Sequence, residues 1–174
     1  LHVTGVQTCA LPILLMGLSK EQIKNGIETF ELTKKRMDIT ELKNGVTIIN
    51  DSYNASFESM RASLKYLHGL NSKRKIAVLG DMFELGEYSK ELHEKVGVEV
   101  AKNNIDMLVC CGTNAKYIVE SAEKEGMQKE NIHYFENREQ VEKFVKDNWQ
   151  SGDSILFKAS NGMKFFNIVE NLIK

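Results

Sequence analysis

The sequence has 174 residues and a formal net charge of −1, and 42% of its residues are hydrophobic. This length suits one domain and a little more, and the hydrophobic content excludes a disordered chain. Because 23 Lys and Arg residues balance 24 Asp and Glu residues, the chain has no overall attraction to nucleic acid or to an anionic membrane surface. We therefore expect no nucleic-acid partner and no membrane partner.

The cysteines and histidines indicate neither a disulfide framework nor a metal site. Cys110 and Cys111 are adjacent within an apolar run, and with Cys9 they make an odd number, so we expect reduced thiols in a cytoplasmic protein. The four histidines show no metal-ligand spacing. The longest apolar run, residues 10–18, is far shorter than the roughly 20 residues of a membrane span, and no anchor is expected.

The amino-terminal region changes character after residue 13. Residues 1–13 show no helical or strand period, and we expect them to be a non-native leader. From residue 14 apolar residues recur at helical spacing as far as Phe30, with Ser19 as a candidate N-cap and Gln22 three residues later. The polar residues 31–35 are expected to connect this helical region to the first strand.

From residue 36 the sequence alternates between short apolar runs and amphipathic segments of helical length. Two runs, 36–42 and 46–49, flank an Asn-Gly turn and are expected to form a hairpin. This alternation predicts an α/β fold, a Rossmann-like and mostly parallel sheet with helices on both faces and one antiparallel strand at the start. The remaining elements are expected as strands at 76–79, 107–111, 132–135 and 155–157, and as helices at 57–69, 88–103, 114–125, 138–149 and 162–173.

Polar side chains gather in the loops that follow the expected strands. Ligands of open α/β sheets bind beyond the carboxyl ends of the strands, which makes these loops the candidate site. Capping of a following helix remains an alternative for the Ser, Thr and Asp residues, although two carboxylates with a lysine across the sheet exceed what capping requires. The polar residues in question are Asp51, Ser56, Asp81, Glu84, Thr113, Lys158 and Ser160.

Three of these loops together resemble a known family. They are residues 51–60 (DSYNASFESM), 79–86 (LGDMFELG) and 158–163 (KASNGM). In combination they are similar to the C-terminal domain of the Mur ligases, and the resemblance extends over about residues 14–174. It implies that residues 14–35 are the tail of a central ATPase domain and that residues 36–174 are the whole C-terminal domain.

The resemblance implies an ATP-dependent reaction of peptidoglycan biosynthesis. The motifs are most similar to those of the members that add D-Ala-D-Ala to UDP-N-acetylmuramoyl-tripeptide. In that reaction ATP phosphorylates a carboxylate of the peptide, the dipeptide amine attacks the acyl phosphate, and phosphate leaves. ATP and Mg²⁺ would be the cofactors, with Mg²⁺ held mainly by the central domain. This chain alone would be inactive, and the complete enzyme would be a cytoplasmic monomer.

Four residues are implied as nucleotide contacts. Arg36 corresponds to a family arginine that reaches the ATP phosphates, and Asp51 to an aspartate that contacts the nucleotide, while Tyr53 and Asn54 line the same loop. A guanidinium fork suits phosphoryl charge, and a carboxylate can accept hydrogen bonds from ribose hydroxyls. The alternatives are a solvated Arg36 and a packed Tyr53 with a satisfied hydroxyl.

Four further residues are implied on the substrate side. Asp81 and Glu84 would face the incoming dipeptide, as a base or as an anchor for its ammonium group. Lys158 and Ser160 would bind a substrate carboxylate or phosphate, with a helix N-terminus behind them. For Ser160 a plain N-cap is the alternative. The implied catalytic residues are thus Asp81, Glu84 and Lys158, and no metal ligand is implied in this chain.

Two positions depart from the family pattern, and other fold families remain alternatives. Phe57 stands where a proline is usual and Asn161 where an arginine is frequent, which removes a rigid helix start and a bidentate anion donor and leaves Lys164 as a point charge. A receiver-like signalling module or another small-ligand-binding α/β module is the alternative. A receiver requires an acceptor carboxylate after its third strand, where this sequence reads Cys-Cys-Gly-Thr at 110–113. A dinucleotide-binding domain lacks its glycine fingerprint here.

Overall fold

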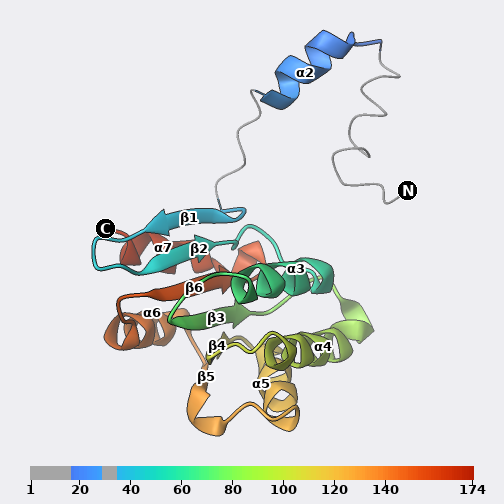
Figure 1. Ribbon diagram of the computed structural model, residues 1–174. Helices are drawn as coiled ribbons and strands as arrows, with labels where there is room; N and C mark the ends of the chain where they lie inside the picture. The colour runs from blue at the N-terminus through green and yellow to red at the C-terminus, as the bar shows by residue number, and fades with distance from the viewer. Residues whose placement is uncertain (1–16, 29–34) are drawn as a thin grey trace. The chain divides into compact units, whose positions relative to one another are not determined.

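The computed structural model describes residues 17–28 and 35–174, and the chain divides into two compact units, Leu1–Thr33 and Lys34–Lys174 (Figure 1). The described part of the first unit is helix α2 (Lys20–Glu28). Its start is capped as predicted, because the Ser19 amide donates to Gln22 Oε1 at 2.9 Å and the Gln22 amide donates to Ser19 Oγ at 3.2 Å. The expected leader at 1–13 and most of the connector at 31–35 lie outside the described residues.

The second unit contains one six-stranded sheet with the strand order β1-β2-β6-β3-β4-β5. β1 pairs with β2 antiparallel, and the other neighbouring pairs are parallel, which confirms the predicted fold class. The strands are β1 (Asp38–Glu41), β2 (Thr47–Asn50), β3 (Arg74–Gly80), β4 (Met107–Cys111), β5 (Ile132–Phe135) and β6 (Asp153–Lys158).

The predicted hairpin between β1 and β2 turns at Gly45, whose φ is +80°. Its amide donates to the Leu42 carbonyl oxygen at 2.9 Å, and the Val46 amide donates to Asn44 Oδ1 at 3.2 Å. Glycine takes this left-handed conformation without the steric penalty of a Cβ atom. The turn therefore sets the register in which Ile39 faces Ile49.

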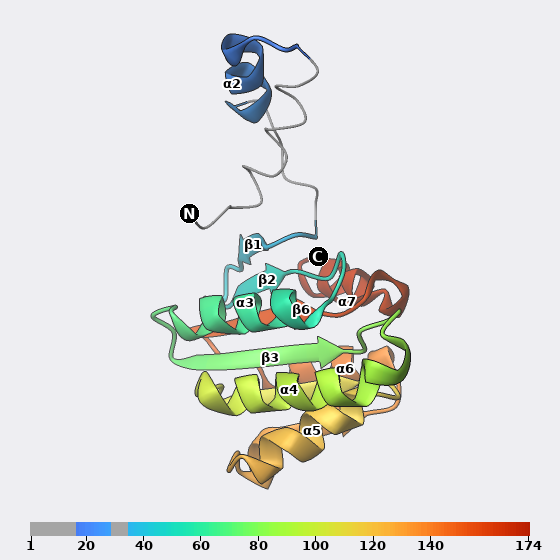
Figure 2. The ribbon, with the colours of Figure 1, turned by 90° about the vertical axis from the view of Figure 1, so that its right-hand side faces the viewer.

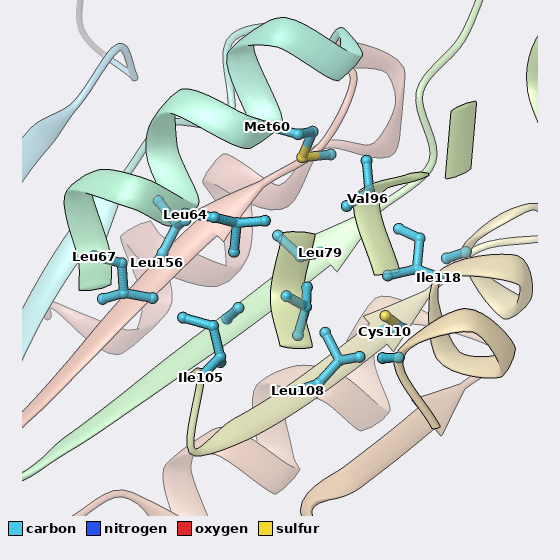
Figure 3. Close-up of a cluster of buried hydrophobic side chains, with 14 of the residues drawn as sticks. Met60, Leu64, Leu67, Leu79, Val96, Ile105, Leu108, Cys110, Ile118 and Leu156 are labelled. Carbon is cyan, nitrogen blue, oxygen red and sulfur yellow. The ribbon is translucent and has the colours of Figure 1, made fainter. Parts of the chain in front are cut away.

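Helices cover both faces of the sheet (Figures 1 and 2). Residues of β2 and β6 alternate between the two hydrophobic clusters, with Ile49 and Leu156 in one and Ile48 and Phe157 in the other. Figure 3 shows the first cluster, formed with α3, α4 and α5. Among the described residues, none of the helices is long and apolar enough to cross a membrane. The helices of this unit are α3 (Phe57–His68), α4 (Ser89–Lys102), α5 (Ala115–Lys124), α6 (Arg138–Asn148) and α7 (Phe165–Leu172).

The last helix begins later than predicted. Asn161–Met163 form a single 3-10 turn, η3, and Lys164 has a φ of 53°. A residue in the left-handed conformation cannot continue a right-handed helix, so α7 begins at Phe165 rather than at residue 162. The long helix N-terminus expected behind Ser160 is consequently displaced by one turn.

Candidate functional site

Three charged residues lie at the carboxyl edge of the parallel strands. Asp51 directly follows β2, Lys158 is the last residue of β6, and Asp81 directly follows β3. Because β6 lies between β2 and β3, the lysine lies between the two aspartates, with Leu79 of β3 opposite Lys158 in the register. All three side chains are buried, and Lys158 is only 1% exposed. A buried charge requires a partner, so these contacts decide what each residue can do.

Asp51 is the partner of Lys158. The Lys158 ammonium group donates to Asp51 Oδ2 at 2.6 Å and to the Asn54 carbonyl oxygen at 3.1 Å. Ser63 of α3 donates its hydroxyl to the same Oδ2 atom at 2.6 Å, and the Met37 amide donates to Oδ1 at 3.3 Å. Both oxygens of the Asp51 carboxylate are thus engaged within the protein.

The backbone segment that Asp51 holds through Met37 carries Arg36. We call residues 35–37 the leading strap, because they precede β1. The Tyr53 amide donates to the Lys35 carbonyl oxygen at 3.0 Å, and the Arg36 guanidinium lies 4.2 Å from the centre of the Tyr53 ring. Lys35 and Met37 have φ values of 75° and 51°, which side chains other than glycine adopt rarely. Bonds to Asp51 and Tyr53 therefore hold a strained strap that presents an exposed arginine.

Arg36 of the leading strap, with Asp51, Tyr53 and Lys158, lines a pocket of about 270 Å³, which we call the arginine pocket. On one side it is closed by the start of α3, where Ser56 and Ser59 form a reciprocal capping box. The start of this helix was expected to be less rigid because Phe57 stands in place of a proline. The capping box instead gives α3 a defined start. The lining residues are Arg36, Asp51, Tyr53, Asn54, Ala55, Ser56, Ser59 and Lys158.

Asp81 has different partners. Its Oδ1 atom accepts hydrogen bonds from the amides of Asn114 at 2.9 Å and Ala115 at 2.7 Å, where α5 begins. Gly112 has a φ of 127°, and a Cβ atom there would collide with the Asp81 carboxylate, so glycine allows this approach. Asp81 therefore caps the start of α5, a helix further along the chain, rather than the helix that directly follows it.

Ser160 belongs to the same region as Asp81. The Ser160 amide donates to the Asp81 carbonyl oxygen at 2.9 Å, and the Phe83 amide donates to Ser160 Oγ at 2.8 Å. Ser160 stands at the N-cap position of η3, but its side chain makes no capping hydrogen bond there. Instead, Ser160 links the loop after β6 to residues 81–84, which we call the β3 loop.

Glu84 is the exposed acid of the β3 loop. Its carboxylate has no hydrogen bond or ion pair with the described residues of the chain, and its φ is 63°. Phe83, which precedes it, is 43% exposed and lies against Gly162. Glu84 thus offers a carboxylate to solvent from a loop whose backbone is held by neighbours.

Burial and the charge of Asp81 raise the pKa values of two neighbouring groups, the Cys111 thiol and the Tyr134 phenol. Burial, and then the Asp81 carboxylate, raise the pKa of the Cys111 thiol to about 11. The same two causes raise the pKa of the Tyr134 phenol, which donates to the Gly112 carbonyl oxygen at 3.0 Å. Both groups are therefore neutral at pH 7 and cannot serve there as a thiolate or phenolate base.

The sequence of this chain matches the model of one known family. Residues 35–161 match the family described as Mur ligase, glutamate ligase domain. The chain belongs to this family. A UDP-N-acetylmuramoyl-tripeptide--D-alanyl-D-alanine ligase from Bacillus subtilis (strain 168) is 35% identical over 159 residues, covering 91% of this chain and 35% of that protein. A protein of the same name from Synechocystis sp. is 32% identical and is covered over 34% of its length. This Mur ligase chain thus spans about a third of the relatives it matches.

Solved structures give the same result. MurF from Acinetobacter baumannii superposes with a TM-score of 0.77 and 27% identity, over 97% of this chain and 36% of that chain. MurF ligase from Thermotoga maritima, in complex with ADP, gives a TM-score of 0.70 and 28% identity over 94% of this chain and 35% of that chain. The Mur ligase fold expected from the sequence motifs is therefore confirmed.

The Mur ligase structure divides the predicted site residues into two groups. The four predicted nucleotide contacts lie together in the arginine pocket, and Lys158 joins them through Asp51. Asp81 and Ser160 lie in the second group, and Glu84 belongs to the same loop as Asp81. Ser63 and Gly112 were not predicted from the sequence, because their roles depend on contacts between distant segments. A serine on the buried face of an amphipathic helix was the one available signal for Ser63.

A larger pocket of about 560 Å³ lies at the opposite edge of the sheet, at the amino ends of β3 and β4. Its arginine, Arg74, is already bound to Asp153, with 2.6 Å between Nη2 and Oδ2. Ligands of open α/β sheets bind at the carboxyl edge, so the arginine pocket and the β3 loop are the candidate site of this Mur ligase domain.

Proposed function

We propose that residues 36–174 form the C-terminal domain of an ATP-dependent ligase that joins D-Ala-D-Ala to UDP-N-acetylmuramoyl-tripeptide. Two matched relatives bear the name of that ligase, and the chain covers about a third of each. The observation that carries the proposal is the arginine pocket, where the residues implied as nucleotide contacts are held together by the leading strap. We also propose a cytoplasmic, monomeric enzyme.

The arginine pocket fits one part of an ATP molecule. Arg36 is exposed and has no carboxylate partner among the described residues, so its guanidinium fork is available to phosphate oxygens. The face of the Tyr53 ring contacts the guanidinium in a cation–π interaction that helps to hold it in place. ATP would supply the phosphoryl group that converts the peptide carboxylate into a better acyl donor. The part of this chain is to bind and neutralise phosphate charge.

The described residues do not fit a magnesium site. They contain no group of three Asp, Glu, His or Cys side chains that could hold a metal ion. Asp51 is bound to Lys158, and Asp81 is bound to two amides. We therefore assign Mg²⁺ binding to the part of the ligase outside this chain.

Glu84 is the group we assign to the amine of the incoming dipeptide. An ammonium group must lose a proton before it can attack a carbonyl carbon, and a free carboxylate can hold it and accept that proton. Asp81 is less suited because its Oδ1 atom caps α5, and its role is to hold the β3 loop. Ser160 holds the same loop through Phe83.

The test is a ligation assay with the complete ligase that contains this chain. Given ATP, UDP-N-acetylmuramoyl-tripeptide and D-Ala-D-Ala, it should release one phosphate for each dipeptide joined, measured by phosphate release and product mass. The matched control replaces D-Ala-D-Ala with glutamate, because the family description names a glutamate ligase domain. Ligation of glutamate but not of the dipeptide would overturn the proposal. The 174-residue chain alone should show no ATP turnover.

The receiver-like alternative has no support in the topology. Numbered in chain order, the parallel strands β2 to β6 lie in the order 1-5-2-3-4. Receivers of the flavodoxin-like type have the order 2-1-3-4-5. The end of β4 also carries two buried thiols where a receiver requires a carboxylate.

A further inference from the structure

One histidine is completely buried next to the β3 loop. His93 lies in α4 and is 0% exposed. The Met82 amide donates to its Nε2 atom at 3.0 Å, and its Nδ1 atom lies 2.6 Å from the Ser89 carbonyl oxygen. Both ring nitrogens are therefore engaged, Nε2 by a backbone amide and Nδ1 by a backbone carbonyl oxygen, with the Ser89 hydroxyl oxygen farther away at 3.5 Å from Nδ1.

These two partners determine which nitrogen of His93 carries the proton. The Met82 amide is a donor, so Nε2 must accept and cannot be protonated. The Ser89 carbonyl oxygen is an acceptor, so Nδ1 carries the hydrogen. The ring is thus a neutral imidazole that joins α4 to the residue after Asp81.

The bond from Met82 completes a set of contacts that holds consecutive residues of the β3 loop. Asp81 is held by Ser160 and the start of α5, and Phe83 is held by Ser160 Oγ. Met82 is held by His93 of α4. Glu84 comes next; it is exposed, and its carboxylate has no hydrogen bond or ion pair with the described residues.

We propose that His93 is a positioning residue for Glu84: its Nε2 atom fixes the Met82 amide, and through it the direction in which the loop projects the Glu84 carboxylate. This inference rests on the proposed function for the kinetic role of Glu84, but the hydrogen bond itself does not. An apolar side chain in place of His93 would leave a buried N–H group without an acceptor, and the loop would move to satisfy it. A side chain that restores an acceptor should keep the loop in place.

The first experiment uses the 174-residue chain in solution. Nitrogen-15 NMR should show His93 as the neutral tautomer with the hydrogen on Nδ1. Amide exchange at Met82 and Phe83 should be at least about tenfold faster in His93→Leu than in the wild type, and His93→Gln should restore most of the protection. Val100→Ala, in the buried part of the same helix, is the control for general loss of stability. A doubly protonated ring, or equal exchange in His93→Leu and Val100→Ala, would overturn the inference.

The second experiment uses the complete ligase. His93→Leu should raise the KM for D-Ala-D-Ala about tenfold or more while the KM for ATP changes less than about twofold, and His93→Gln should recover most of the loss. A purely structural role predicts that both KM values or the active fraction change together, as in Val100→Ala, and that result would refute the positioning role. If the wild-type ligase does not use D-Ala-D-Ala, the proposed function fails, whereas the NMR experiment still decides whether His93 holds Met82.

Discussion

The arginine pocket and the β3 loop both stabilise a buried aspartate, but they do so with different partners. Each contains a buried aspartate directly after a parallel strand, Asp51 after β2 and Asp81 after β3. Asp51 is bound mainly by side chains, the Lys158 ammonium group and the Ser63 hydroxyl. Asp81 is bound by backbone amides at the start of α5. In both regions the buried acid holds structure, and an exposed residue nearby remains available for a ligand.

The exposed residues in the two regions have opposite charge. Arg36 lines the arginine pocket, and Glu84 is the last residue of the β3 loop. A cation suits phosphate, and an anion suits an ammonium group. In the proposed site, the residues that stabilise the domain are therefore distinct from the residues assigned to a substrate, and substitutions should separate the two kinds.

The largest effect is expected from Lys158→Met, which leaves the buried Asp51 carboxylate without its cation. Removing one partner of a buried ion pair lowers stability by about 3–5 kcal/mol. Urea unfolding of the 174-residue chain, followed by circular dichroism, measures the loss. The double variant Lys158→Met with Asp51→Asn should recover part of it, because no charge is then buried alone. An unfolding midpoint equal to that of the wild type would show that the pair does not stabilise the fold.

Asp81→Ala should lower stability by less, about 1–2 kcal/mol, because it removes the carboxylate that accepts hydrogen bonds from the amides at the start of α5. Asp81→Asn is the matched variant, since its side-chain oxygen can still accept from the amides of Asn114 and Ala115. In the same urea assay Asp81→Asn should lose less than half as much free energy of unfolding. Equal losses in the two variants would contradict the capping role.

Arg36→Ala should affect the nucleotide and leave the fold intact. The loss of a charge-assisted phosphate contact should raise the KM for ATP in the complete ligase about tenfold, a difference of about 1.4 kcal/mol. The unfolding free energy of the 174-residue chain should change by less than about 0.5 kcal/mol because the side chain is exposed. Arg36→Lys serves as the control that keeps the charge but loses the fork. An unchanged KM for ATP in Arg36→Ala would remove this residue from the nucleotide site.

The smallest effect on the kinetics is expected at Glu84. Glu84→Gln should raise the KM for D-Ala-D-Ala about fivefold while stability changes by less than about 0.5 kcal/mol, since the carboxylate is exposed. Glu87→Gln, at the next exposed acid along the chain, is the control. If both variants gave the same KM as the wild type, the dipeptide amine would not be held by this carboxylate.

Much of this molecule could be predicted from local sequence pattern. The strand and helix periods from residue 36 onward predicted the elements and the loops that carry the site, because alternation and helical spacing depend on neighbouring residues. The exception among them was the last helix, whose delayed start is caused by the left-handed conformation of Lys164. The lysine at this position does not indicate a left-handed conformation, because lysine is a common helix former.

The sequence by itself determined the fold class, the family and which loops meet at one edge, because parallel strands place their carboxyl ends together. Only the tertiary structure decided that Lys158 pairs with Asp51 rather than with Asp81, a contact between residues 107 positions apart. It also decided that Asp81 caps α5 and that His93, at no metal-ligand spacing in the sequence, faces Met82. The physical reason is that these contacts join residues far apart in the sequence. They depend on the order of the strands and on the direction of each side chain, and neither produces a periodic pattern in the local sequence.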